Sequence, residues 1–166
     1  MNAMGLQVST PSDREIVLTR GFNAPRSLVF DTMARPELIQ RWLSGPPGWS
    51  MVECESDPRV GGSFRHVWRG DDGTEMTMHG VYREIVRPER VVRNEIFEHG
   101  SAGVLGEQLA TLVLTEQDGK TTLTITVLYP SREARDATIA SGMERGVKAS
   151  YDLLEELLAS ITAGRD

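Results

Sequence analysis

Histidine and tyrosine are the side chains of this sequence best suited to acid–base chemistry. The three histidines, His66, His79 and His99, are isolated along the chain, and this spacing predicts no metal site. His66 stands among aromatic and apolar residues, where it is either a hydrogen-bonded core residue or a ligand contact or proton donor. Tyr82 and Tyr151 carry hydroxyl groups that suit the same roles.

Cys54 is the only cysteine, so no internal disulfide can form and an oxidising compartment is not implied. No base adjoins it in the sequence, which favours a structural strand residue over a reactive thiol. The N-terminal residues lack the apolar stretch of a signal peptide, and we expect a cytoplasmic protein.

Three glycines, Gly100, Gly103 and Gly106, resemble a nucleotide-binding loop only superficially. A strand pattern follows them rather than a helix, so no helix N-terminus awaits a phosphate. The segment 98–107 instead predicts a mobile loop, which either covers the opening of a binding site or is an ordinary surface loop.

The elements that position these side chains form an α+β pattern in a single domain. A strand over 16–22 precedes two short helices, the first starting after Pro25 and the second carrying Trp42. Strands separated by turn signals then fill the chain to residue 129, as in an antiparallel meander. From Ser131 the apolar period becomes helical for roughly thirty residues, or about 45 Å. We expect flexible tails at 1–13 and 161–166 and one domain over 14–160.

Turn chemistry predicts which side chains share a face of the sheet. With Gly73 in the left-handed position of a three-residue loop, Trp68 faces Met76 and His66 faces Met78. Phe64 then faces Gly80, and a two-residue turn at 118–119 pairs Leu114 with Leu123. The first hairpin face is rich in methionine and aromatic residues, which indicates either a core under the helix or a ligand cavity.

Composition excludes several classes of partner. The chain has 18 basic and 24 acidic residues, and its net charge of -6 disfavours nucleic acid and membrane surfaces as partners. The expected partner is a small hydrophobic molecule, without metal or other cofactor. The oligomeric state stays open, a homodimer included.

Six segments, in order along the chain, resemble a known family; they are 22–31, 36–42, 57–64, 80–85, 88–92 and 141–146. Together they resemble the START-like (SRPBCC) superfamily, and within it the branch related to the activator of heat-shock protein 90 ATPase. The resemblance implies a helix-grip fold, in which a curved antiparallel sheet wraps around a long C-terminal helix. Leu43 and Val147 depart from the family pattern, which often has aromatic residues there, and Val147 should widen a cavity.

The superfamily includes binders of hydrophobic ligands, polyketide cyclases and chaperone-activating domains, so fold alone does not assign a function. The first hypothesis is binding of a hydrophobic or aromatic small molecule between sheet and helix. The alternatives are a cyclase or dehydratase that uses cavity histidine and tyrosine, and a chaperone-interacting module. The residues predicted to line the cavity are Trp42, Phe64, His66, Trp68, Met76, Met78, Tyr82, Met143, Val147 and Tyr151.

Overall fold

The computed structural model of the chain describes residues 4–45, 47–100 and 103–164. Within them, eight antiparallel strands form one curved sheet in the order β1-β2-β8-β7-β6-β5-β4-β3. The strands are β1 (Gln7–Ser9), β2 (Glu15–Phe22), β3 (Trp49–Ser56), β4 (Ser63–Gly70), β5 (Glu75–Val86), β6 (Arg90–His99), β7 (Val104–Gln117) and β8 (Lys120–Leu128). The predicted α+β class and helix-grip architecture are confirmed.

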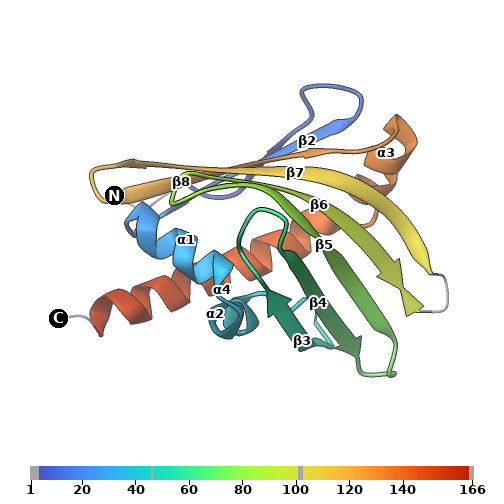
Figure 1. The fold of residues 1–166 in the computed structure, drawn as a ribbon, viewed down its shortest axis with the longest axis horizontal. Coiled ribbons are helices and arrows are strands. Elements are labelled where there is room, and N and C mark those ends of the chain that lie inside the picture. Colours follow the sequence, from blue (N-terminus) through green and yellow to red (C-terminus); the bar gives the residue numbers. More distant parts are fainter. Residues whose placement is uncertain (1–3, 46, 101–102, 165–166) are drawn as a thin grey trace.

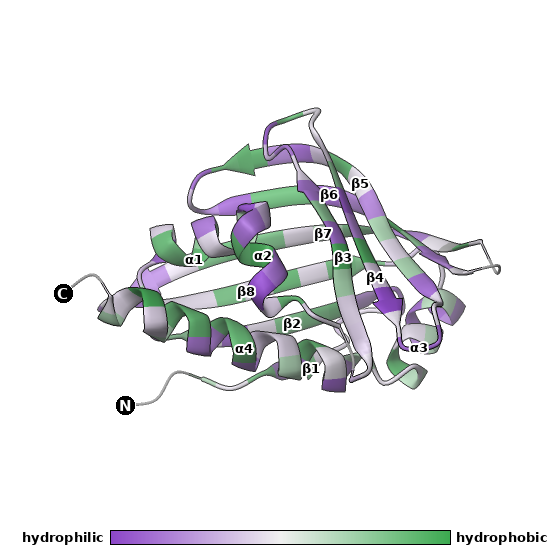
Figure 2. Cartoon of the chain, turned by 90° about the horizontal axis from the view of Figure 1, so that it is seen from below, coloured by the Kyte–Doolittle hydropathy of each residue, from purple (hydrophilic) through white to green (hydrophobic). Residues whose placement is uncertain are grey.

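Helices cover the concave side of this sheet. Helices α1 (Arg26–Ala34) and α2 (Pro36–Trp42) follow β2, and α3 (Arg132–Ala140) precedes α4 (Met143–Ala163). Figure 1 shows α4 running beneath the sheet, with α1 between the two at one end and α2 beside α4. Seen from below in Figure 2, α4 crosses the open side of the sheet; its buried residues are Ser150, Tyr151, Leu154, Leu157 and Leu158.

The prediction of one unbroken helix from Ser131 is wrong. Gly142 takes a left-handed conformation with φ 82°, which ends α3 and lets α4 begin in a new direction. Ser131 does cap α3, because its side chain accepts a hydrogen bond from the Ala134 N–H.

The predicted hairpin registers are confirmed. His66 pairs with Met78 and Trp68 with Met76, while Gly73 adopts φ 87° in the intervening turn. Leu114 pairs with Leu123 across β7 and β8. Asp118 and Gly119, with φ 55° and 75°, supply the two positive φ angles that a tight two-residue turn requires.

Two segments differ from the predicted boundaries. Residues 7–9, expected in a flexible tail, form β1 and pair with β2. The predicted loop 98–107 is shorter, since β6 continues to His99 and β7 begins at Val104. Residues 101–102 of that loop lie outside the described residues.

The buried apolar side chains form three clusters rather than one. The largest joins β2, α1, α2 and the second half of α4 around Phe22 and Leu154, and we call it the Phe22 cluster. The Ile16 cluster consists of Ile16, Leu18, Val127 and Tyr129. The hairpin cluster consists of Phe64, Trp68, Met78 and Tyr82. Half-buried apolar side chains connect these clusters: Leu43, Ile85 and Val91 pack against both the Phe22 and the hairpin clusters, and Leu6, Ile125 and Val147 against both the Phe22 and the Ile16 clusters.

Candidate functional site

The hairpin cluster is built by alternation along β4 and β5. Phe64, His66 and Trp68 occupy every second position of β4 and are 1%, 2% and 4% exposed. The His66 ring centroid lies 5.3 Å from that of Phe64 and 5.9 Å from that of Trp68. Tyr82 lies beside Phe64, with ring centroids 5.7 Å apart. The structure therefore brings most of the predicted hairpin residues together around His66.

Strand β6 adds two charged side chains that the sequence analysis missed. Arg93 and Glu95 alternate with Asn94 and face the interior; the Arg93 Nη2 lies 2.9 Å from the Glu95 Oε2, and its Nε donates to the same oxygen at 3.0 Å. Gln108 of β7 donates to the other Glu95 oxygen at 2.8 Å. The Arg93 guanidinium also lies 3.9 Å from the centroid of the Phe64 ring, a cation–π contact. The inner face thus carries a polar cluster made of Arg93, Glu95 and Gln108.

A sequence signal for this polar cluster exists in the alternation of β6. Val91 and Phe97 pack against the hairpin cluster, and Arg93 and Glu95 lie between them at intervals of two. Arg93 also pairs with Tyr82 in the sheet register. Because Val91 and Phe97 are apolar and would be expected to face inward, the alternation predicts that Arg93 and Glu95 between them face inward as well.

His66 is electrically neutral in this environment. Burial, with a smaller contribution from the nearby Arg93 charge, lowers the pKa of His66 to about 3. Burial likewise raises the pKa of Tyr151, with Glu95 adding to the effect, so that its hydroxyl stays protonated. Cys54 pairs with His66 in the sheet register, and burial raises the pKa of its thiol to about 11. That thiol is a poor nucleophile at neutral pH.

The hydrogen-bonding capacity of His66 is unused. Among the described residues, neither its Nδ1 nor its Nε2 has a hydrogen-bond partner, although both atoms are buried. The Tyr82 hydroxyl, in contrast, lies 2.7 Å from the Ser56 Oγ and forms a hydrogen bond with it. The Arg20 Nε and the Glu155 Oε2 are also buried without a partner among the described residues, but His66 alone has both of its nitrogens unpaired. Because most buried polar atoms in proteins are paired, His66 marks a candidate functional position.

The helical residues predicted to line the cavity lie in other clusters. Met143 and Val147, both half-buried, pack against the Ile16 cluster, and Val147 also reaches the Phe22 cluster. Among the described residues, neither packs against the hairpin cluster. Tyr151 lies 6.1 Å from Trp42, ring centroid to centroid, within the Phe22 cluster. The structure does not bring Met143 and Val147 into the hairpin cluster, and their place in the wall of a cavity stays a prediction.

A surface groove lies at the point where β8 ends and β7 continues paired with β6 alone. Its volume is about 210 Å³, and Gln108 is among its lining residues. Tyr129 lines it too and belongs to the Ile16 cluster. Most of the other lining residues alternate with the inward side chains and belong to the outer face. They are Arg14, Arg83, Asn94, Glu107, Leu109, Leu128 and Pro130.

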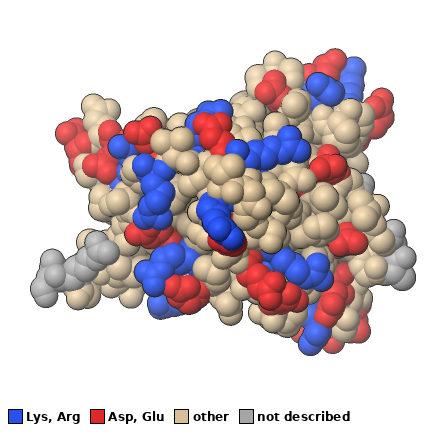
Figure 3. All heavy atoms as spheres, viewed as in Figure 1, with Lys and Arg blue, Asp and Glu red and all other residues tan. Residues whose placement is uncertain are grey.

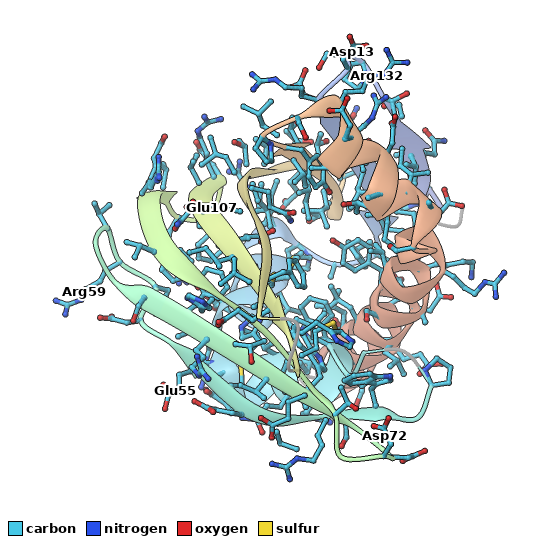
Figure 4. All side chains as sticks on the ribbon, turned by 90° about the vertical axis from the view of Figure 1, so that its right-hand side faces the viewer. Asp13, Glu55, Arg59, Asp72, Glu107 and Arg132 are labelled. Carbon is cyan, nitrogen blue, oxygen red and sulfur yellow. The ribbon has the colours of Figure 1, made fainter. Side chains whose placement is uncertain are left out.

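The outer surface offers little further chemistry. Within the described part of the chain, no three histidine, cysteine, aspartate or glutamate side chains converge as metal ligands. None of the helices described here has the length and apolar character needed to cross a membrane. Figure 4 shows the six labelled charged side chains at the periphery, away from the space between the sheet and α4.

A curved sheet that grips a C-terminal helix, with two short helices after the first long strand and a partly polar interior, defines the START-like (SRPBCC) class. The sequence profile described as activator of Hsp90 ATPase homolog 1-like protein matches residues 23–159. The chain belongs to this family. The resemblance inferred from the six segments is thereby confirmed.

Solved structures agree with this assignment. A Rhodobacter sphaeroides protein is 32% identical, with a TM-score of 0.85 over 93% of this chain and 98% of that chain. A Chromobacterium violaceum protein is 26% identical, with a TM-score of 0.75 over 89% and 98%. A Nitrosomonas europaea protein shares the fold at 24% identity, with a TM-score of 0.80 over 93% and 99%. The comparison with curated proteins gave no match.

Proposed function

We propose that this chain binds a hydrophobic or aromatic small molecule in its interior, between the hairpin cluster and α4. The observation that carries the proposal is the polar cluster on β6 and β7, which lies between the hairpin cluster on β4 and β5 and the Ile16 cluster on β2 and β8. Binding sites for small molecules combine apolar walls with a few placed polar groups, and this interior has both.

Partial exposure of inward side chains supports the same conclusion. Met76 and Phe97 pack against the hairpin cluster, and Met143 packs against the Ile16 cluster, yet all three are only half-buried. Methionine adapts its shape to neighbouring molecules more readily than branched side chains do. We propose that these three residues and Val147 line the binding site together with the buried residues of the hairpin cluster.

Two measurements test the proposal. Native mass spectrometry of the purified protein should detect a bound small molecule of apolar character. Val147→Trp should weaken binding of a bulky hydrophobic probe while the melting temperature stays near that of the parent protein. A packed core at residue 147 would instead lose roughly 1–3 kcal/mol to strain, and that result would contradict a cavity there.

A cyclase or dehydratase is the second candidate function, favoured by the neutral His66 in an interior that also buries Tyr82 and Tyr151. A neutral imidazole can accept a proton, and the hydroxyl of Tyr82 or Tyr151 can donate one. Incubation with candidate polyketides separates the two proposals, because a binder returns them unchanged and a cyclase yields product.

A chaperone ATPase-activating module is the third candidate, and the family description is its support. On the face seen in Figure 3, side chains of both charge signs are intermixed over the surface. Stimulation of Hsp90 ATPase activity by the purified protein is the assay that would favour it.

A further inference from the structure

We infer that the interior selects uncharged aromatic molecules that carry a hydroxyl group, and that His66 is the residue that recognises the hydroxyl. The inference rests on the proposed binding function and deepens it by naming the chemical class of the ligand. It depends on the unused nitrogens of His66 and on the internal pairing of Arg93 and Glu95.

The first step concerns what His66 can bind. A neutral imidazole has one N–H donor and one bare nitrogen acceptor. In this structure both are buried and, among the described residues, without a hydrogen-bond partner. A hydroxyl group donates and accepts, so it can pair with whichever nitrogen it meets. An apolar ligand would leave both nitrogens unsatisfied, and a buried polar atom without a partner is costly.

The second step concerns charge. The Arg93 Nε and Nη2 both pair with one carboxylate oxygen of Glu95, and the other Glu95 oxygen accepts a hydrogen bond from Gln108. The charges of Arg93 and Glu95 therefore cancel within the site. A carboxylate ligand would bring an unpaired negative charge close to Glu95, and a cation would do the same beside Arg93. Burying an unpaired charge costs several kcal/mol, so the site favours a neutral ligand.

The third step concerns the apolar part of the ligand. The His66 ring lies between Phe64 and Trp68, with the Trp68 ring nearly perpendicular to it at 85°. Met78 pairs with His66 across the sheet and belongs to the same cluster. Aromatic rings favour such edge and offset contacts, so a ring that carries the hydroxyl would find partners on the neighbouring strands.

Three probes of one ring system test the inference: 2-naphthol, naphthalene and 2-naphthoate. Each is titrated by calorimetry at pH 7.5 into the parent protein, His66→Leu and the matched control His79→Leu. His79 lies on β5 and faces the outer side, where it pairs with Glu98 at 3.1 Å. The parent protein and the control should bind 2-naphthol roughly tenfold more tightly than naphthalene, the gain expected of one buried hydrogen bond. They should bind 2-naphthoate most weakly.

His66→Leu should bind 2-naphthol and naphthalene with equal affinity. Nitrogen-15 NMR of the parent protein gives an independent readout, because 2-naphthol should shift the ring resonances of His66 much more than naphthalene does. Equal binding of these two probes by the parent protein would overturn the inference and leave the proposed function intact. Tightest binding of 2-naphthoate would also overturn it, with Arg93 as the recognition group. Failure of all three probes to bind any variant would overturn the proposed function as well.

Discussion

Replacing His66 with leucine should make the ligand-free protein more stable. The substitution removes two buried nitrogen atoms that have no partner among the described residues. It replaces the imidazole with an apolar side chain of similar size. An unsatisfied buried polar group costs about 1–3 kcal/mol, so the free energy of unfolding should rise by about that amount at pH 7.5. A rise of this size corresponds to roughly 2–12 °C in melting temperature for a domain of this length.

The same substitution should flatten the dependence of stability on pH. The pKa of His66 is about 3 in the folded protein and 6.5 in its ordinary state. Between these values the unfolded chain binds a proton that the folded protein does not, so stability falls as the pH is lowered. One pKa unit corresponds to about 1.4 kcal/mol, and lowering the pH from 7.5 to 4.5 should cost about 2–3 kcal/mol through His66.

Urea denaturation at pH 7.5 and 4.5 measures both effects in the parent protein, His66→Leu and His79→Leu. His66→Leu should lack about 2–3 kcal/mol of the acid-dependent loss, whereas His79→Leu should keep it. A lower stability of His66→Leu at pH 7.5, or an unchanged loss at pH 4.5, would refute the reasoning. Either result would mean that His66 is hydrogen-bonded in solution.

Three further substitutions test the interior. Leu154→Ala should cost about 2–5 kcal/mol in chemical denaturation because Leu154 is fully buried, whereas Leu153→Ala, 38% exposed, should cost much less. Gly80→Ala should cost about 3 kcal/mol or more, since a Cβ atom there would lie 1.9 Å from the backbone oxygen of Asn94. An alanine tolerated at residue 80 would contradict this close approach. Glu95→Leu should cost about 3–5 kcal/mol in stability because it leaves the buried charge of Arg93 unpaired. The double variant with Arg93→Leu should regain most of that loss. Additive losses from the two substitutions would contradict the pairing.

The hairpin registers were predictable because local chemistry determines them. Gly73 and the Asp118–Gly119 pair require positive φ angles, and each fixes the pairing of a whole hairpin. Once the register was set, alternation alone placed Phe64, His66 and Trp68 on one buried face.

Arg93 and Glu95 were missed because charged residues on a strand usually face solvent. Their burial depends on pairing with each other and with Gln108, a contact between two strands that a single segment does not reveal. The helix break at Gly142 was missed for a related reason. The helical pattern continues on both sides of the break, and one glycine inside it gives only a weak signal.

The three-cluster interior also implies that the two ends of the sheet differ in local stability. Strands β7 and β8 lie over the Phe22 cluster, which α1, α2 and α4 cover, whereas β3 is an edge strand beside the smaller hairpin cluster. Backbone amides of β3 and β4 should therefore exchange with deuterium through partial openings, while those near Leu114 and Leu123 exchange only on global unfolding. A molecule bound around His66 would add contacts to the hairpin cluster, so the least protected strands should gain the most protection when the interior is filled.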